Sequence, residues 1–442
     1  MEKKVITQYE QCVDYINDIP KFTSKHSIED TVEFLTYLGN PDVGMNIIHV
    51  AGSNGKGSVC AYLRSMLEEA DKTVCLFTSP HLVDIRERFI VKGHMISSEK
   101  FLQAFLQIYD AVFSYNNENN RENMEFYHPT FFEYLFFMAM LIFKEADMDV
   151  VILETGLGGL LDATNSVRKK ALSVITGISL EHTEYLGNTL QEVAFQKAGI
   201  IKNGCRCVFA DREKEVSEVF IKVCEEQKVP YRAVDTSKCI VGDIETNFDS
   251  KTIAFSLRTV YYGIVGCLLP TNALYQAQNA AVAVAAFEEF TQGKEDVSAI
   301  QKGLLKCKWA GRMEEVCEGV FLDGAHNDDG IRALLETVKA DGCRGRRILL
   351  FSVVSDKDYR SMADRIKKSN LFDSVYIAPM DNKRALDLDT LQKVFNIDKA
   401  NCYTGVKEAY RYLKSIRKPK DHLYITGSLY LVGEIKGYEV QS

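Results

Sequence analysis

The chain has 442 residues, of which 46% are hydrophobic and 26% charged, and its formal net charge is −8. These values are typical of a globular protein with more than one domain, and the negative charge disfavours nucleic acid as a partner, because phosphate binding requires a basic face. The twelve cysteines include no C-x-x-C pair, and the sequence has no signal peptide, so we expect a cytoplasmic protein with reduced thiols. No apolar run reaches transmembrane length, so we expect no binding to a membrane.

A glycine-rich turn follows the first part of the chain. Two helices are expected in residues 5–45, with turns at Pro20 and at residues 39–41. The turn itself lies between a short apolar stretch, residues 46–50, and a helical pattern over residues 59–70. Glycines between a strand and a helix allow backbone N–H groups to surround phosphate oxygens, and the helix N-terminus adds positive potential. The residues expected to form this phosphate-binding loop are Gly52, Asn54, Gly55, Lys56, Gly57 and Ser58.

Within this loop, Lys56 is expected to reach the terminal phosphates of a nucleotide, and the Ser58 hydroxyl is expected to bind Mg²⁺. The spacing differs from the common pattern, in which Ser or Thr directly follows the lysine, because Gly57 stands between the two residues. A glycine-rich turn without a ligand is the alternative interpretation. The order of strand, lysine, hydroxyl and helix favours phosphate binding.

Strands and helices alternate after this loop as far as residue 290. The expected elements are a strand at 73–77, a polar loop at 78–82, a helix at 97–115, an exposed loop at 115–121, a helix at 129–146, strands at 149–153, 173–176 and 205–210, a helix at 191–198, an antiparallel patch at 240–266 and a helix at 274–290. This alternation predicts an α/β fold of the P-loop type, with a mostly parallel, doubly wound sheet.

The second half of the chain repeats the alternation on a smaller scale. Strands are expected at 320–322, 348–351, 374–377 and 422–425, with helices between them. We place the domain boundary after residue 295, so that residues 1–295 form the phosphate-loop domain and residues 296–442 form a smaller α/β domain.

Two residues at expected strand ends are candidates for metal binding. Glu154 ends one strand and His182 follows another, and an open parallel sheet directs such positions to one edge. Together with Ser58, Glu154 supplies the hard oxygen ligands that Mg²⁺ prefers, whereas His182 is an unusual ligand for that ion. Taken singly, Glu154 is equally well explained as a carboxylate at a helix N-terminus, and His182 is more often a structural histidine.

Eight short motifs in series carry a resemblance to a known family. They are Ala51-Gly52-Ser53-Asn54-Gly55-Lys56-Gly57-Ser58, Phe77-Thr78-Ser79-Pro80-His81-Leu82, Glu154-Thr155-Gly156-Leu157-Gly158-Gly159 with Leu161-Asp162-Ala163-Thr164-Asn165, Lys197-Ala198-Gly199-Ile200, Gly311-Arg312-Met313-Glu314, Asp323-Gly324-Ala325-His326-Asn327, Asp356-Lys357-Asp358 and Thr426-Gly427-Ser428-Leu429-Tyr430. The chain resembles the folylpolyglutamate synthase and dihydrofolate synthase family, the folate branch of the Mur ligase superfamily. The resemblance covers nearly the whole chain, and Gly57 is normal in that family.

The resemblance implies an ATP-dependent ligase that converts a folate or dihydropteroate carboxylate to an acyl phosphate, which L-glutamate then attacks. It implies two Mg²⁺ ions, with Lys197 carbamylated so that it becomes a metal ligand. The implied catalytic residues are Lys56, His182 and Lys197, and the implied metal ligands are Ser58, Glu154, His182 and Lys197.

The resemblance also assigns residues outside the first loop. Asn279, Arg312, Asp323 and His326 match positions that contact the nucleotide, and Asp356-Lys357-Asp358 ranks low for chemistry. Residues expected at the acceptor are Ser79, His81 and Arg86, with Arg88 as a further basic candidate. We expect a monomer.

Three positions depart from the family pattern. Leu160 stands where many bifunctional members have arginine, Gln196 replaces glutamate, and Ser352 replaces glycine. None of them belongs to the phosphate or metal residues. Leu160 leaves open which folate species is accepted, although we expect both activities on one chain.

Three other classes of protein remain as alternatives. A peptidoglycan-precursor Mur ligase usually carries a further N-terminal domain, for which the roughly 45 residues before the loop are too few. A non-catalytic nucleotide-binding regulator needs the loop but not Glu154, His182 and Lys197. A P-loop kinase gives no reason for the second α/β domain.

Overall fold

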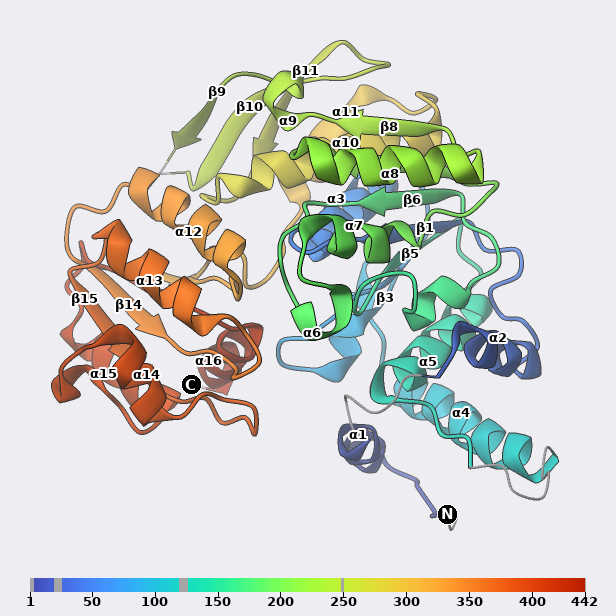
Figure 1. Ribbon diagram of the computed structural model, residues 1–442, viewed down its shortest axis with the longest axis horizontal. Helices are drawn as coiled ribbons and strands as arrows, with labels where there is room; N and C mark the ends of the chain where they lie inside the picture. Colours follow the sequence, from blue (N-terminus) through green and yellow to red (C-terminus); the bar gives the residue numbers. More distant parts are fainter. Residues whose placement is uncertain (1–3, 20–25, 119–125, 248–249, 442) are drawn as a thin grey trace.

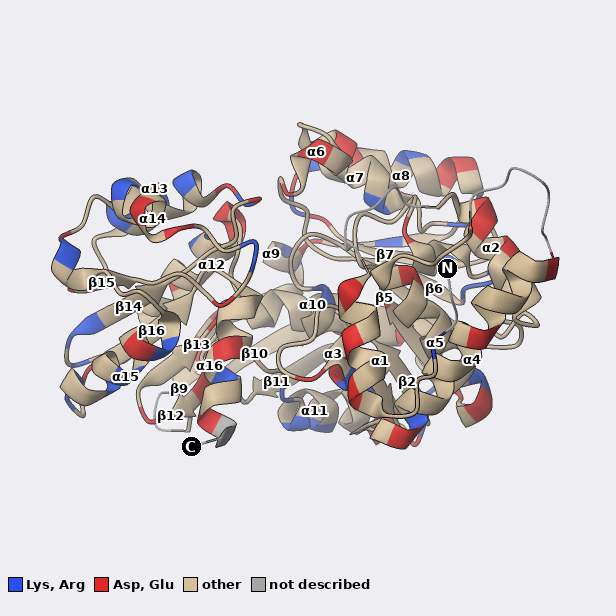
Figure 2. Cartoon of the chain, turned by 90° about the horizontal axis from the view of Figure 1, so that it is seen from below, with Lys and Arg blue, Asp and Glu red and all other residues tan. Residues whose placement is uncertain are grey.

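The computed structural model describes residues 4–19, 26–118, 126–247 and 250–441. Two α/β domains lie side by side, with the C-terminal domain on the left of Figure 1. Figure 2 shows acidic and basic residues interspersed over both domains. Among the described residues, no helix combines the length and the apolar character needed to cross a membrane.

The N-terminal domain is built on an eight-stranded sheet of order β4-β3-β2-β5-β1-β6-β7-β8. Its strands are β1 (Ile47–Ala51), β2 (Val74–Phe77), β3 (Phe89–Val91), β4 (His94–Met95), β5 (Val150–Glu154), β6 (Leu172–Ile175), β7 (Arg206–Ala210) and β8 (Tyr231–Val234). All neighbouring strands from β2 through β5, β1, β6 and β7 to β8 pair in parallel. At the other edge β3 runs in the opposite direction and pairs antiparallel with both β2 and β4. The predicted doubly wound, mostly parallel sheet is confirmed.

Helices cover both faces of this sheet because successive residues of its buried strands point to opposite sides. Ile48 and Val50 of β1 pack in the core formed with α3, α10 and α11, whereas Ile47 packs in the core formed with α1, α2, α4 and α5. The helices of this domain are α1 (Tyr9–Asp18), α2 (Ile28–Tyr37), α3 (Lys56–Glu69), η1 (Ile85–Arg88), α4 (Ser98–Glu118), α5 (Phe131–Ala146), η2 (Ala163–Ser166), α6 (Thr183–Leu186), α7 (Leu190–Ala198), α8 (Lys214–Gln227), α9 (Thr236–Cys239), α10 (Tyr275–Thr291) and α11 (Val297–Lys306).

A separate antiparallel sheet of three strands packs beside α11. Its strands are β9 (Ile240–Asn247), β10 (Thr252–Arg258) and β11 (Ile264–Leu269). This sheet confirms the antiparallel patch expected at 240–266.

The C-terminal domain has a five-stranded sheet of order β12-β13-β16-β14-β15, in which only β12 is antiparallel. Its strands are β12 (Glu314–Cys317), β13 (Val320–Leu322), β14 (Arg347–Phe351), β15 (Ser374–Ile377) and β16 (His422–Thr426). Its helices are α12 (Asp328–Ala340), α13 (Tyr359–Ser369), α14 (Leu388–Phe395), η3 (Lys399–Asn401), α15 (Val406–Ile416) and α16 (Leu429–Gln441).

One expectation differs from the structure in detail. The exposed loop expected at 115–121 was wrong at its start, because α4 continues to Glu118 and Tyr115 packs edge-on against Phe34 at 5.4 Å between ring centroids. Residues 119–121 and the turn at Pro20 lie outside the described residues. The boundary predicted after residue 295 falls just before α11, which packs on α3 through a 2.7 Å hydrogen bond from Ser65 Oγ to the Gly303 carbonyl. The domain boundary itself stays a prediction.

Candidate active site

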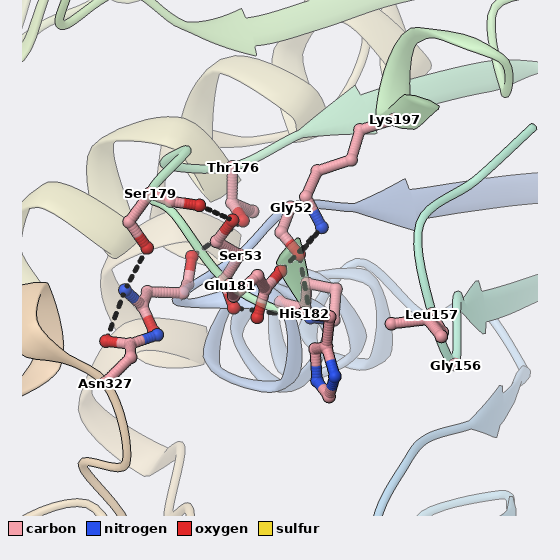
Figure 3. A network of polar contacts seen from close by, with 12 residues as sticks. Gly52, Ser53, Gly156, Leu157, Thr176, Ser179, Glu181, His182, Lys197 and Asn327 are labelled. Atoms are coloured by element: carbon pink, nitrogen blue, oxygen red, sulfur yellow. Dashed lines mark hydrogen bonds and ion pairs between the residues drawn. The ribbon is translucent and has the colours of Figure 1, made fainter. Parts of the chain in front are cut away.

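The predicted phosphate-binding loop lies at the carboxyl end of β1 and leads into α3 (Figure 3). Gly52 and Gly55 have φ values of 150° and 90°. A Cβ atom would lie 1.8 Å from Thr176 Oγ1 at Gly52 and 2.3 Å from Asn279 Oδ1 at Gly55. Only glycine fits at these two positions, because both the backbone conformation and the close neighbours exclude a side chain.

Lys56 is the first residue of α3, and its ammonium group folds back over the loop. Its Nζ donates to the carbonyl oxygens of Gly52 at 2.8 Å and Ser53 at 3.4 Å. The same charge lies within electrostatic range of the Glu154 and Glu181 carboxylates. Lys56 therefore bonds the loop and also places a positive charge near two buried carboxylates.

Beneath the loop, a chain of amides holds the Ser58 hydroxyl. Ser58 Oγ accepts from Gln276 Nε2 at 3.1 Å, and Gln276 Oε1 accepts from Asn279 Nδ2 at 3.0 Å. Ser58 and Asn279, predicted to contact metal and nucleotide, thus form the floor of the loop together. The sequence motifs did not indicate Gln276, although it lies on the same helix as Asn279, one turn earlier.

Glu154 ends β5, the neighbour of β1, and is only 3% exposed. Its Oε2 accepts the backbone N–H of Ser79 at 3.1 Å. Burial raises the pKa of Glu154 to about 7, although the charge of Lys56 opposes this shift. The predicted metal-binding carboxylate is therefore adjacent to the loop predicted to contact the acceptor.

Lys197, near the end of α7, points toward the same loop (Figure 3). Its Nζ donates to the Gly52 carbonyl at 2.9 Å and forms a 2.8 Å ion pair with Glu181, and the two side chains are 1% and 6% exposed. Burial lowers the pKa of Lys197, against the opposing charge of Glu181. Burial alone would raise the pKa of Glu181, but the charges of Lys197 and Lys56 hold it well below its usual value.

His182 is the residue where the two domains make an unexpected contact. Its Nε2 lies 2.9 Å from Nζ of Lys357, which comes from the loop after β14 in the C-terminal domain. Burial lowers the pKa of His182 to about 4, and the charge of Lys357 acts in the same direction. His182 is thus a neutral imidazole at neutral pH. The sequence alone predicts no chemical role for Lys357, because a lone charged loop motif usually marks a solvated surface.

The C-terminal domain presents its predicted nucleotide residues near β13. Asp323 Oδ2 accepts from the Tyr275 hydroxyl of α10 at 2.6 Å, and burial raises the pKa of Asp323. Arg312 packs on Gly324, where a Cβ atom would lie 2.4 Å from its Nη1. His326 Nδ1 lies 2.8 Å from the Gly324 carbonyl, and burial lowers the pKa of His326 to about 3. The neutral His326 therefore donates from Nδ1 and keeps Nε2 as an acceptor.

A reciprocal pair of amides joins the phosphate loop to the second domain. Asn54 Nδ2 donates to Asn327 Oδ1 at 3.3 Å, and Asn327 Nδ2 donates back to Asn54 Oδ1 at 3.0 Å. Asn54 Nδ2 also lies 3.1 Å from both Ser179 Oγ and Asp329 Oδ2. Asn327 caps α12 through its bond to Gly330 N–H at 2.7 Å, so the start of α12 is docked on the phosphate loop.

The other residues predicted at the acceptor have local partners. Arg86 forms a 2.7 Å ion pair with Asp84 and donates to Ser98 Oγ at 3.0 Å. His81 Nδ1 accepts from Arg88 Nε at 2.9 Å. Arg88 is 5% exposed and lies within electrostatic range of the buried carboxylate that ends β5. An acceptor contact of His81 or Arg86 stays a prediction. Of the two arginines Arg86 and Arg88, it is Arg88 whose charge acts on Glu154, a predicted metal ligand.

The donor chemistry of these residues suits Mg²⁺. Among the residues that the structure describes, no three His, Cys, Asp or Glu side chains cluster as a metal-binding group. Mg²⁺ does not need such a cage, because it keeps several waters and uses one or two carboxylates together with substrate phosphates. Glu154 and Ser58 supply hard oxygens, and His182 supplies a neutral ring nitrogen. Lys197 fits as a ligand only after its amine has become a carbamate.

Comparisons with known proteins cover nearly the whole chain. The family model of the Mur ligase middle domain matches residues 50–287, and that of the Mur ligase glutamate ligase domain matches residues 311–429. The dihydrofolate synthase/folylpolyglutamate synthase of Bacillus subtilis is 33% identical over 98% of this chain and 99% of its own length. Folylpolyglutamate synthase of Mycobacterium tuberculosis complexed with ADP superposes with a TM-score of 0.88 at 26% identity, covering 98% of both chains.

A second solved structure, E. coli FolC in complex with DHPP and ADP, superposes with a TM-score of 0.84 at 27% identity, again over 98% of both chains. The two family models match the two domains in order, and both solved structures superpose over nearly the whole chain. The chain therefore belongs to the Mur ligase family, in the folate branch that contains the dihydrofolate and folylpolyglutamate synthases.

Proposed function

We propose that this protein is an ATP-dependent, ADP-forming ligase that joins L-glutamate to the carboxylate of a folate or of dihydropteroate through an acyl phosphate. One observation carries the proposal. A single sheet edge brings Lys56, Glu154 and Lys197 together, and the second domain closes on that edge through Asn54 and Asn327. The names of the relatives support the same reaction and substrates.

The charges of the site match the needs of this reaction. A carboxylate oxygen attacks the γ-phosphorus while the bond to ADP breaks, so two anions must approach each other. The ammonium group of Lys56, which bonds the loop carbonyls of Gly52 and Ser53, would neutralise the terminal phosphates. The amine of glutamate then attacks the acyl carbon and phosphate leaves, a step that requires the exclusion of water from the acyl phosphate. Docking of α12 on the phosphate loop closes the site from one side.

We propose that Ser58 and Glu154 hold one Mg²⁺ and that His182 and a carbamylated Lys197 hold a second. These ions supply positive charge at the transferring phosphoryl group. Lys357 places a further positive charge at His182 and is suited to meet an anionic substrate when the domains are closed. We also propose that the enzyme acts as a cytoplasmic monomer without nucleic acid or membrane.

The test of the function is product analysis by mass with each acceptor in turn. ADP release is expected to require both L-glutamate and a pteroate-containing acceptor. Release that depends on a UDP-muramyl substrate would favour a peptidoglycan ligase instead. ATP binding without turnover of any acceptor would favour a non-catalytic regulator.

We expect both dihydropteroate and tetrahydrofolate to be extended by this chain. Leu160 lacks the guanidinium of many bifunctional members, and its backbone lies against Gly199 with its N–H bonded to Gln196 O at 2.7 Å. A buried contact between a charged group and its partner is worth a few kcal/mol, on the order of 1.5–3, which is enough to change the preferred acceptor. If only tetrahydrofolate is extended, the double activity is wrong, and recovery of dihydropteroate use by Leu160→Arg would assign the cause.

Metal binding is expected to weaken as the pH falls through 7. Glu154 must be ionised to bind a cation, and burial raises its pKa to about 7, so protons compete with the metal below that pH. His182, with a pKa of about 4, stays neutral between pH 6 and 8 and adds nothing to the effect. Calorimetric titration of the ADP complex with Mn²⁺ should show about tenfold weaker binding at pH 6 than at pH 8. Equal affinity at the two pH values, or an equal slope in Glu154→Gln, would contradict this assignment.

A further inference from the structure

A buried chain of hydrogen bonds lies behind Glu154, and the proposed chemistry does not use it. His49 Nε2 on β1 lies 2.7 Å from Thr164 Oγ1, and Thr164 Oγ1 lies 2.5 Å from Asp162 Oδ1. All three residues are at most 1% exposed. Burying polar groups of this kind costs folding free energy unless they are hydrogen-bonded, so these hydrogen bonds constrain the fold.

The protons in this row of hydrogen bonds can be arranged in only one way. A carboxylate oxygen accepts, so the Thr164 hydroxyl donates to Asp162 and its oxygen must accept the Nε2–H of His49. Burial lowers the pKa of His49 well below its usual value, so its ring carries a single proton, which is placed on Nε2. Nδ1 of His49 is buried and has no partner among the described residues.

Asp162, the last residue in this row of hydrogen bonds, holds the loop that follows Glu154. Asp162 Oδ2 accepts the backbone N–H groups of Gly156 at 2.9 Å and Leu157 at 2.8 Å. On its other side Gly156 meets the ring of Phe132, which a Cβ atom would approach to 2.7 Å. The loop is therefore fixed from two sides directly after the carboxylate, and Figure 3 draws Gly156 and Leu157 beside the cluster around His182.

The same short segment also holds the end of the helix that carries Lys197. Asn165 Nδ2 donates to the carbonyls of Leu160 and Gly199, both at 3.1 Å. Gly159 lies so close to α7 that a Cβ atom there would be 2.9 Å from the Lys197 carbonyl. Residues 162–165 thus connect the two elements that present Glu154 and Lys197.

We propose that His49, Thr164 and Asp162 form a positioning unit that fixes the loop after Glu154 and thereby sets the affinity of the site for Mg²⁺. This inference rests on the proposed function, in which Glu154 holds the metal. None of the three residues touches substrate or metal in this scheme. They act through the backbone N–H groups of Gly156 and Leu157, as outer residues around metal ligands commonly do.

The experiment compares three variants of the full chain. Thr164→Val keeps the shape of the side chain but removes the hydroxyl between His49 and Asp162, whereas Thr164→Ser retains the hydroxyl. Thr155→Val is the matched control, because Thr155 Oγ1 is equally buried, directly follows Glu154 and has no partner among the described residues. Binding of Mn²⁺ to the ADP complex is measured by calorimetry, with the melting temperature recorded for each variant.

Thr164→Val is expected to weaken Mn²⁺ binding about tenfold or more, while Thr164→Ser and Thr155→Val bind as the wild type does. If Thr164→Val does not fold, His49→Leu removes the first donor and leaves the bond from Thr164 to Asp162. That variant is expected to weaken binding about threefold, a smaller loss than the roughly tenfold one expected where the hydroxyl itself is removed.

A folded Thr164→Val protein with wild-type Mn²⁺ affinity would overturn the positioning role, even if its melting temperature fell. If His49→Leu has to be used instead, wild-type Mn²⁺ affinity in that variant would overturn the role as well. A wild-type protein that binds no Mn²⁺ in its ADP complex would overturn the proposed metal site itself, and the two failures are thus distinguished.

Discussion

Replacing Lys56 by alanine is expected to lower kcat/KM for glutamate ligation by at least about a thousandfold, because it removes the cation at the transferring phosphoryl group. The ammonium group is held over the loop by the carbonyls of Gly52 and Ser53. Water does not replace this charge. The rate is measured as ADP release with saturating L-glutamate and acceptor.

The fold should survive this change. Lys56 Nζ donates to two carbonyls of its own loop and forms no ion pair shorter than 4 Å among the described residues. Lys214→Ala is the control for loss of one lysine, since Lys214 is 90% exposed and, within the described part of the chain, its ion pair is with Glu218 on its own helix. A Lys56→Ala enzyme that kept a tenth of the wild-type kcat/KM, a loss of only about 1.4 kcal/mol, would contradict the role.

Much of the fold follows from local patterns in the sequence. Residues 47–51 and 150–154 are uninterrupted apolar runs apart from His49 and the terminal Glu154, which is typical of strands buried on both faces of a parallel sheet. In the short hairpin of β3 and β4, the apolar run has only the three residues of β3, and both residues of β4 are exposed. The edge of the sheet was therefore not predictable by periodicity.

The site was predictable where a motif stands at the end of a strand, as Gly52 and Glu154 do. It was not predictable where residues meet across domains. Lys357 and His182 are 175 positions apart, and Asn54 and Asn327 are 273 apart, so no spacing relates them. Glu181 was not predicted for another reason. Its role depends on the buried ammonium group of Lys197, which faces it only in the folded protein.

Lys197 is the second residue whose loss is expected to abolish most of the activity. It is buried in an ion pair with Glu181, and both groups lie within electrostatic range of Lys56. Burial lowers the pKa of Lys197, which increases the fraction of neutral amine. Only the neutral amine reacts with CO₂, forming an N–C bond and releasing one proton as the carbamate appears.

Carbamate formation would reverse the electrostatics of this pair. An ammonium group neutralises Glu181, whereas a carbamate places a second negative charge beside it. Two adjacent anions are stable in a buried site only when cations bind between or beside them. Carbamylation and metal binding are therefore expected to be coupled, with metal and nucleotide favouring the carbamate and their removal favouring the ion pair with Glu181.

Lys197→Ala is expected to lower kcat by about a hundredfold or more and to be rescued in part by acetate, which returns a carboxylate to the vacated position. The same change removes the ion-pair partner of the buried Glu181 and is expected to cost about 3–5 kcal/mol of unfolding free energy. Lys197→Ala combined with Glu181→Gln separates the two effects, since it should regain stability but not activity. ¹³C NMR of the wild type in labelled bicarbonate, with and without Mg²⁺ and an ATP analogue, tests the carbamate directly. A carbamate resonance that appears only with metal and nucleotide is the expected result, and an unmodified amine in that complex would remove Lys197 from the metal ligands.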